Sequence, residues 1–181
     1  AHRGWPRTAC ITAMPVDRRG CGYSDSSLNG KNVMNWDKKV VGCELCAQIG
    51  GELIWQNEQV RVILVNDPLF TGFTRVIWQE HAAEMTDLTP EQRSQLMRTV
   101  CLVEQIQRDV LKPTKVNLAS LGNMVAHVHW HVIPRFEDDA CFPNPVWALT
   151  PEQAKTAKAN RVTPELLNDY MRALKIALWS H

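Results

Sequence analysis

Residues 126–135 read Ala126-His127-Val128-His129-Trp130-His131-Val132-Ile133-Pro134-Arg135. Three of the chain's six histidines fall here at every second position, and mostly apolar residues alternate with them. Side chains on a strand alternate between its two faces, so this period of two predicts a strand with three imidazoles on one face. Each buried imidazole needs a partner, which packing alone does not supply. We expect the row to bind a metal or a phosphate, or to attack a phosphate.

The composition is that of one globular domain with appendages. The 181 residues are 45% hydrophobic and have a net charge of +1, so nothing in the balance suggests binding to nucleic acid or to a membrane surface. No apolar run approaches the ~20 residues of a membrane span, and the first residues lack the apolar core of a secretory signal. Six cysteines in a chain of this length do not indicate a disulfide scaffold. We therefore expect a cytoplasmic, reduced protein.

The sequence divides into three parts. Residues 1–42 have neither helical nor strand periodicity, and we expect an irregular N-terminal extension. Residues 43–149 contain the patterned, compact part, and residues 150–181 form a C-terminal helical segment. Within the compact part we expect strands at residues 52–56, 60–65, 74–79 and 115–119, with a helix from Thr89 to about Leu111. In the last segment an apolar stripe at helical spacing predicts a docking surface; it comprises Leu167, Tyr170 or Met171, Leu174 and Leu178.

The sequence Cys43-Glu44-Leu45-Cys46 places two thiols on one tight turn. This spacing suits zinc, and it also occurs in thioredoxin-type redox sites. No βαβ pattern surrounds the two cysteines, which favours the metal.

The histidine row resembles the histidine-triad motif of the HIT superfamily of nucleotide hydrolases and transferases. His127, His129 and His131 match the three histidine positions, and Val132 and Ile133 match the apolar positions that follow. The resemblance implies an α+β HIT-like fold with an antiparallel sheet of about five strands, a packing helix and a homodimer. Because His131 stands where the uridylyltransferase branch has Gln, the hydrolase branches are favoured.

The resemblance also implies the chemistry. His129 would attack the α-phosphorus of a nucleotide substrate and form a nucleotidyl-histidine, which splits one displacement into two. Its other ring nitrogen must then bond an acceptor that fixes the tautomer. His131 would donate to phosphate oxygens. His127 would help to bind phosphate, or would anchor the strand through a metal.

In the zinc-binding branch of the superfamily, a CxxC motif near the domain start pairs with two histidines. The corresponding positions here are Cys43, Cys46, His81 and His127. The resemblance therefore implies a structural zinc ion with Cys₂His₂ ligands.

Four further residues occupy places that the resemblance connects with nucleotide binding. Asp67 matches an aspartate that binds ribose hydroxyls in Hint-type relatives, and it could equally start an ordinary Asp-Pro turn. Asn117 and Asn123 are the best amide donors for phosphate near the triad. Trp147 could stack on a base or seal a dimer.

Two other classes of function remain open. A metal-dependent hydrolase would use the three histidines as ligands of one catalytic zinc ion. Straight alternation suits this poorly, because the Cα atoms of the outer two histidines would lie about 13 Å apart. A nucleotide-binding adaptor with little turnover would use the same residues to sense a ligand.

Overall fold

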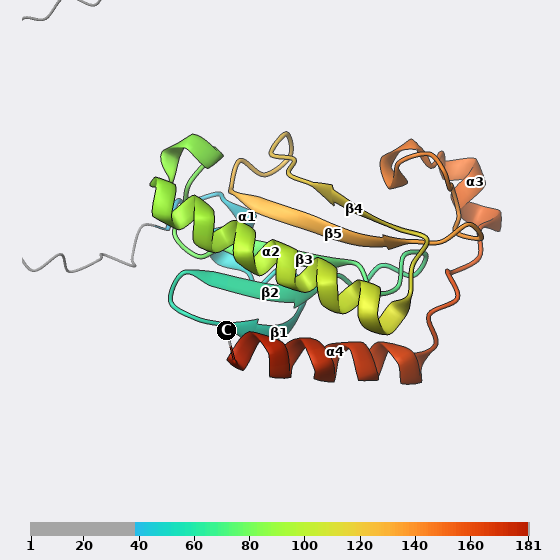
Figure 1. The fold of residues 1–181 in the computed structure, drawn as a ribbon. Coiled ribbons are helices and arrows are strands. Elements are labelled where there is room, and N and C mark those ends of the chain that lie inside the picture. Colours follow the sequence, from blue (N-terminus) through green and yellow to red (C-terminus); the bar gives the residue numbers. More distant parts are fainter. Residues whose placement is uncertain (1–38, 181) are drawn as a thin grey trace, which may run out of the picture. The chain divides into compact units, whose positions relative to one another are not determined.

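A five-stranded antiparallel sheet forms the centre of residues 39–180, the part of the chain that the computed structural model describes (Figure 1). Its strand order is β1-β2-β3-β5-β4. The strands are β1 (Glu52–Gln56), β2 (Val60–Leu64), β3 (Thr74–Trp78), β4 (Lys115–Ala119) and β5 (His129–Arg135). The predicted α+β architecture is confirmed, and four strands lie within one residue of their predicted bounds.

The fifth strand, β5, begins at His129, two residues later than the alternating histidines predict. The backbone of the two residues before β5 forms hydrogen bonds with loops and does not extend the regular pairing of β5 with β3. The His127 N–H donates to Val125 O at 2.8 Å, and the Val128 N–H donates to Ala82 O at 2.7 Å. His127 therefore lies outside the strand, although it neighbours the end of β3 through the bond from Trp78 N–H to Val128 O.

Helix α2 (Pro90–Leu111) covers one face of the sheet (Figure 1). Thr89 caps its first turn by accepting from Gln92 N–H, and proline at the first helical position needs no N–H partner there. The buried face includes Leu96, Val100, Val103 and Gln107. The Gln107 amide is fully buried because its Nε2 donates to Gly72 O and Val132 O, each at 3.0 Å.

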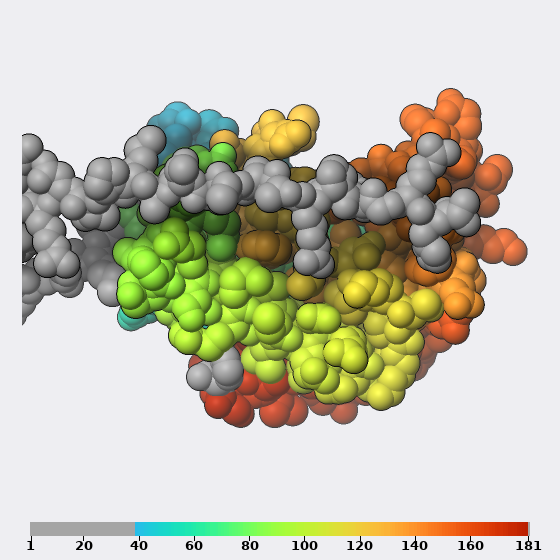
Figure 2. All heavy atoms as spheres, turned by 45° about the horizontal axis from the view of Figure 1, so that its top comes forward, coloured from blue at the N-terminus to red at the C-terminus, as the bar shows by residue number. Residues whose placement is uncertain are grey.

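Helix α4 (Pro164–Trp179) packs along α2 and β1, where it completes the same core. In the space-filling view the red residues of α4 border those of α2 (Figure 2). Tyr170, Leu174 and Leu178 are buried, which confirms the predicted apolar stripe at these positions. The Tyr170 hydroxyl lies 2.8 Å from Thr74 Oγ1 on β3. The short helix α3 (Pro151–Thr156) contributes no buried residue.

The opposite face of the sheet contains the polar residues that build the site. Residues directly opposed on neighbouring strands share a face. Arg75 is opposed to His131, and Ile77 is opposed to His129. The single-turn helix α1 (Glu44–Ala47) covers part of this face, where Leu45 packs on Ile63 and Ile77. The loops of residues 120–127 and 139–149 lie beside the same strands; the second contains the 3₁₀ turn η2 (Val146–Ala148).

The irregular extension predicted for residues 1–42 falls almost entirely outside the described residues, as does His181. The division at residues 42/43 and 149/150 stays a prediction. Between residues 39 and 180, no helix combines the length and the apolar character needed to cross a lipid bilayer.

Candidate functional site

Two cysteines and two histidines meet between α1, the end of β3 and the start of β5. The four ligand atoms of Cys43, Cys46, His81 and His127 all lie within 4.8 Å of one another. His127 Nδ1 is 3.5 Å from each sulfur, and His81 Nδ1 is 3.4 Å from Cys46 Sγ. The structure thus brings together all four residues that the sequence predicts as metal ligands.

The spacing fits a tetrahedral metal. Zinc bonds of about 2.3 Å to sulfur and about 2.05 Å to nitrogen place the two donor atoms about 3.6 Å apart at a tetrahedral angle. The sulfur–nitrogen distances of 3.4–3.5 Å agree with this edge. His127 Nε2 also lies 2.7 Å from Trp78 O. An Nε2–H donating to this carbonyl leaves the Nδ1 lone pair pointing at the thiols, as a metal ligand requires.

The sheet topology explains why these residues meet. His81 follows β3 and His127 precedes β5, and the two strands are neighbours, so the imidazole centroids lie 5.3 Å apart. Arg61 on β2 holds the cysteine turn, since its Nη2 donates to Leu45 O at 2.6 Å and its Nε to Ile49 O at 3.2 Å. Burial raises the pKa of the Cys46 thiol, although Arg61 opposes the shift.

The other two histidines form a second group. The His129 and His131 ring centroids lie 4.8 Å apart on β5. His129 Nδ1 is 2.6 Å from His127 O, so an Nδ1–H donates to this carbonyl and Nε2 keeps its lone pair. The Ser120 hydroxyl donates to His129 O at 3.0 Å and ties the loop to the strand. Burial, more than the nearby Arg75, lowers the pKa of His129.

His131 is 4% exposed and lies between two aromatic rings. The centroids of Phe73 and Trp147 are each 5.4 Å from its own. Its Nδ1 is buried and has no hydrogen-bond partner among the described residues. Burial, followed by the charges of His129 and Arg75, lowers the pKa of His131 to about 3. The imidazole is therefore neutral at ordinary pH.

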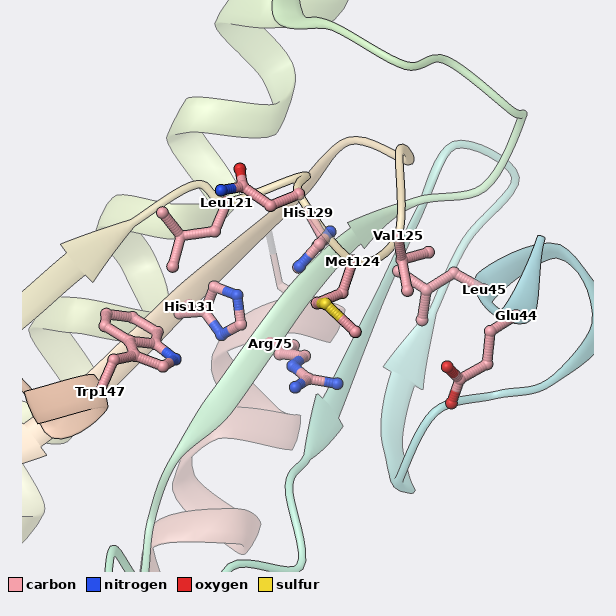
Figure 3. Close-up of a pocket in the computed structure, with 10 residues that line it drawn as sticks. Glu44, Leu45, Arg75, Leu121, Met124, Val125, His129, His131 and Trp147 are labelled. Atoms are coloured by element: carbon pink, nitrogen blue, oxygen red, sulfur yellow. The ribbon is translucent and has the colours of Figure 1, made fainter. Parts of the chain in front are cut away.

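His129 and His131 open into a cavity of about 360 Å³ (Figure 3). Trp147 and His131 form one side, and Glu44 and Leu45 of α1 form the other. The loop residues Leu121, Asn123, Met124 and Val125 and the β3 residue Arg75 complete the lining. The cysteine turn therefore serves two purposes, because its flanks hold the metal-ligand group and its middle residues wall the cavity.

Residues 47–138, half of the chain, match the model of the HIT domain. This chain belongs to the HIT family. Membership supports a function of the nucleotide-binding or nucleotide-hydrolase type. The matched range includes the three histidines of β5 and its approach, whereas Cys43, Cys46 and Trp147 lie outside it.

Curated HIT relatives are distant in sequence. The chain is 27% identical over 96 residues to the asymmetrical bis(5'-nucleosyl)-tetraphosphatase of Schizosaccharomyces pombe, a match that covers 50% of this chain and 53% of that protein. The chain thus spans about half the length of this relative. A HIT-like protein of Methanocaldococcus jannaschii is 27% identical over 105 residues, which cover 54% of this chain and 81% of that protein.

Solved structures agree on the fold. A histidine triad protein from Bradyrhizobium japonicum superposes with a TM-score of 0.60 at 26% identity, covering 72% of this chain and 92% of that one. A second, from Marinobacter aquaeolei, gives a TM-score of 0.59 at 24% identity, covering 76% and 94%. These likenesses establish the HIT-like α+β fold predicted from the sequence.

The structure separates the predicted HIT site residues. His129, His131, Asn123 and Trp147 line the cavity, and Trp147 is 52% exposed there. The His127 ring has one nitrogen near the thiols and the other near Trp78 O, so only its backbone contacts the His129–His131 pair.

Asp67 and Asn117 lie elsewhere. Asp67 Oδ1 accepts from the N–H groups of Leu69 and Phe70, and the residue lines a separate cavity beside Gly72. Asn117 Oδ1 accepts from Arg135 Nη1 at 2.7 Å. Their predicted contacts with a nucleotide remain predictions.

Arg135 fixes the loop that carries Trp147. Its Nε and Nη2 donate to the two oxygens of Asp139, and Nη2 also donates to Asn144 O at 2.8 Å. The two side chains of this ion pair are 1% and 0% exposed. The C-terminal end of β5 is thereby bound to residues 139–144, which precede Trp147 in the loop.

Sequence reasoning missed Arg75. It lies on β3 opposite His131, and its guanidinium enters the cavity (Figure 3). A signal was present, because a charged residue at the second position of the apolar run Thr74–Trp78 breaks the pattern of a buried strand.

Proposed function

We propose that this protein is a nucleotide hydrolase that cleaves a bond at the α-phosphorus of a nucleoside monophosphate derivative through a nucleotidyl-His129 intermediate. The observation that carries the proposal is the 2.6 Å contact between His129 Nδ1 and His127 O. It holds the imidazole in the tautomer whose Nε2 is a free nucleophile. Burial lowers the pKa of His129, which favours the unprotonated form of this nitrogen.

The two steps follow from the groups that line the cavity. The Nε2 lone pair bonds to phosphorus as the bond to the leaving group breaks. Water then displaces the imidazole and releases the nucleoside monophosphate. His131 lines the cavity beside His129, which suits a hydrogen bond from its ring to the substrate. The Asn123 amide and the Trp147 ring would contact the nucleotide from the loops.

We propose that the Cys₂His₂ group holds zinc, which would supply cross-linking of the fold. Cys43, Cys46, His81 and His127 would hold the ion between three parts of the chain that are distant in sequence. Because His127 belongs to this group, its side chain acts as an anchor. Its backbone carbonyl is then a fixed acceptor for His129, so the His127 anchor positions the nucleophile.

The geometry does not favour a single catalytic metal bound by three histidines. His127 pairs with His81, whereas His129 and His131 form a separate pair. Both nitrogens of His127 contact groups outside the cavity. The similarity to the bis(5'-nucleosyl)-tetraphosphatase of Schizosaccharomyces pombe supports hydrolysis over simple binding. The homodimer implied by the family resemblance remains a proposal, for which the edge strand β4 would be available.

The test is to trap the intermediate. The protein is mixed with a 5'-adenylate donor labelled at the α-phosphorus, quenched in base, and digested for peptide mapping. We expect acid-labile label on His129 in the wild type and none in His129→Ala, whose turnover should fall by several powers of ten, on the order of 10⁴-fold or more. His181→Ala is the matched control and should keep both the label on His129 and the wild-type turnover. Label on another residue, or near-normal turnover of His129→Ala, would refute the mechanism.

A further inference from the structure

The strands of the sheet contain three arginines on the face that forms the site, namely Arg61, Arg75 and Arg135. Two of them have protein partners for every guanidinium nitrogen. Arg61 donates to Ile49 O, Gln79 Oε1 and Leu45 O. Arg135 donates to Asp139, Asn117 and Asn144. Both therefore serve to hold loops in place.

Arg75 differs from both. Its Nε is buried and has no hydrogen-bond partner among residues 39–180. Its guanidinium carbon lies 5.7 Å from the Phe73 ring centroid, which packs one side of it without satisfying the N–H groups. Among the described residues no group accepts from its Nη atoms either, and because Arg75 lines the cavity, an anion bound there can accept from them. The opposing carboxylate of Glu44 lies across the cavity and is itself exposed.

The position of Arg75 relates it to the leaving group. Arg75 is opposed to His131, whereas Ile77 is opposed to His129, so Arg75 lies two residues, about 6–7 Å, further along the strands than the nucleophile. Arg75 lines the same cavity as His129 and His131, so its guanidinium can contact a second phosphate that is joined to the α-phosphorus.

We propose that Arg75 forms an anion subsite for a phosphate of the leaving group, so that this site selects phosphoanhydrides over substrates with uncharged leaving groups. The proposal rests on the nucleotidyl-histidine function given above and names its substrate class. His129 Nε2 forms a bond to the α-phosphorus, and the bond from this phosphorus to the bridging oxygen breaks. Its electron pair departs on the β-phosphate, next to the Arg75 guanidinium. Water then attacks the α-phosphorus, the lone pair returns to Nε2, and the water proton passes to solvent.

The state of His131 supports the same substrate class. An amine or alkoxide leaving group needs a proton as it departs, and burial, His129 and Arg75 keep the pKa of His131 at about 3. A departing phosphate needs no proton, and the guanidinium can stabilise its charge directly.

The experiment compares two adenylate donors on the same variants. Diadenosine tetraphosphate has a phosphate leaving group, and adenosine 5'-phosphoramidate releases ammonia. We expect Arg75→Met to lower kcat/KM for the tetraphosphate by about 10- to 100-fold, and for the phosphoramidate by less than about threefold. Arg75→Lys keeps the positive charge but lacks the planar guanidinium, so its kcat/KM for the tetraphosphate should lie between those of the wild type and Arg75→Met. Arg172→Met, which removes an exposed arginine from α4, is the matched control and should change neither.

Binding gives a readout independent of turnover. In the His129→Ala background, titration calorimetry with ADP and AMP measures how much the second phosphate contributes to binding. ADP should bind at least about 10-fold more tightly than AMP, and Arg75→Met should reduce this ratio to about one. The substitution should not unfold the protein, because it replaces an unpaired, half-buried cation with an apolar side chain; near-wild-type thermal unfolding checks this.

The outcomes separate the two proposals. If the wild type labels His129 and Arg75→Met loses both activities equally, Arg75 binds the reacting phosphate and the subsite proposal is wrong. An unchanged ADP-to-AMP ratio would overturn it as well. If the wild type cleaves neither donor and labels no histidine, the proposed function fails and the subsite fails with it.

Discussion

Replacing Asp139 with asparagine should lower the free energy of unfolding by about 3–5 kcal/mol near pH 7. The carboxylate accepts from Arg135 Nε at 2.6 Å and Nη2 at 3.0 Å. It also accepts from the backbone N–H groups of Phe136, Cys141 and Phe142. An asparagine offers one acceptor oxygen and turns an NH₂ toward these donors. The substitution therefore leaves a buried guanidinium without its counter-charge, for which losses of this size are typical.

The neighbouring residue supplies the control. Asp138 pairs with Arg161 at 3.0 Å, but the two side chains are 54% and 57% exposed. Solvent screens such a pair, so Asp138→Asn should cost less than about 1 kcal/mol. Urea denaturation followed by tryptophan fluorescence measures both variants against the wild type. If the two substitutions differ by less than about 1 kcal/mol, the buried ion pair does not stabilise the fold as inferred.

The same variant has a pH signature. Burial acts to raise the pKa of Asp139, but Arg135 and the backbone N–H groups outweigh it and hold the pKa below its usual value. A depressed carboxyl pKa stabilises the folded state above the unfolded pKa of about 3.9, and this stabilisation is lost as the pH falls through the folded value. The gap between wild type and Asp139→Asn should therefore be constant from about pH 5 to 7 and narrow below about pH 4. A gap that widens on acidification would contradict the sign.

Further predictions concern the metal-ligand group and the core. Zinc-replete protein should contain about one zinc ion per chain, and Cys43→Ala/Cys46→Ala should lose both the ion and several degrees of thermal stability, whereas Cys101→Ala should keep both. Metal analysis and a melting curve decide this, and a metal-free wild type prepared with excess zinc would refute it. Leu174→Ala should lower the free energy of unfolding by about 2–5 kcal/mol, because Leu174 is fully buried between α4 and the core. Ile176→Ala, at a site 63% exposed on the same helix, should change it by less than about 1 kcal/mol, and equal losses would show that α4 does not dock as described.

Local patterns in the sequence predict most of the fold. The period of two at residues 129–135 and the apolar stripe at helical spacing near the C-terminus each depend on neighbouring residues, and each predicts the observed element. The alternation failed at its first member, because His127 bonds to the loop carbonyl of Val125 and leaves the ladder. The alternation within one strand does not show at which residue its pairing with the neighbouring strand begins.

The site was partly predictable for the same reason. The CxxC pair and the His129–His131 pair follow from spacing within short segments, whereas the family resemblance adds His81 and His127 to the metal-ligand group. Arg75 and Arg135 were not recognised, because their roles depend on which strands become neighbours and on how many acceptors each guanidinium finds. The sequence predicts Asn117 as an amide donor to phosphate, but it gives no sign that Asn117 Oδ1 accepts from Arg135 on the adjacent strand. Such pairings are set by register across the sheet.

The segment shared with the HIT family ends at residue 138, one residue before the carboxylate that neutralises Arg135. It also ends before α4, whose Tyr170 and Leu174 are fully buried. The range matched by the HIT domain model is therefore shorter than the part of the chain that shares one core. A polypeptide cut at residue 138 would retain all three triad histidines and yet contain a buried cation without its counter-ion and an uncovered apolar groove. The fold that holds these histidines thus depends on residues C-terminal to the matched range.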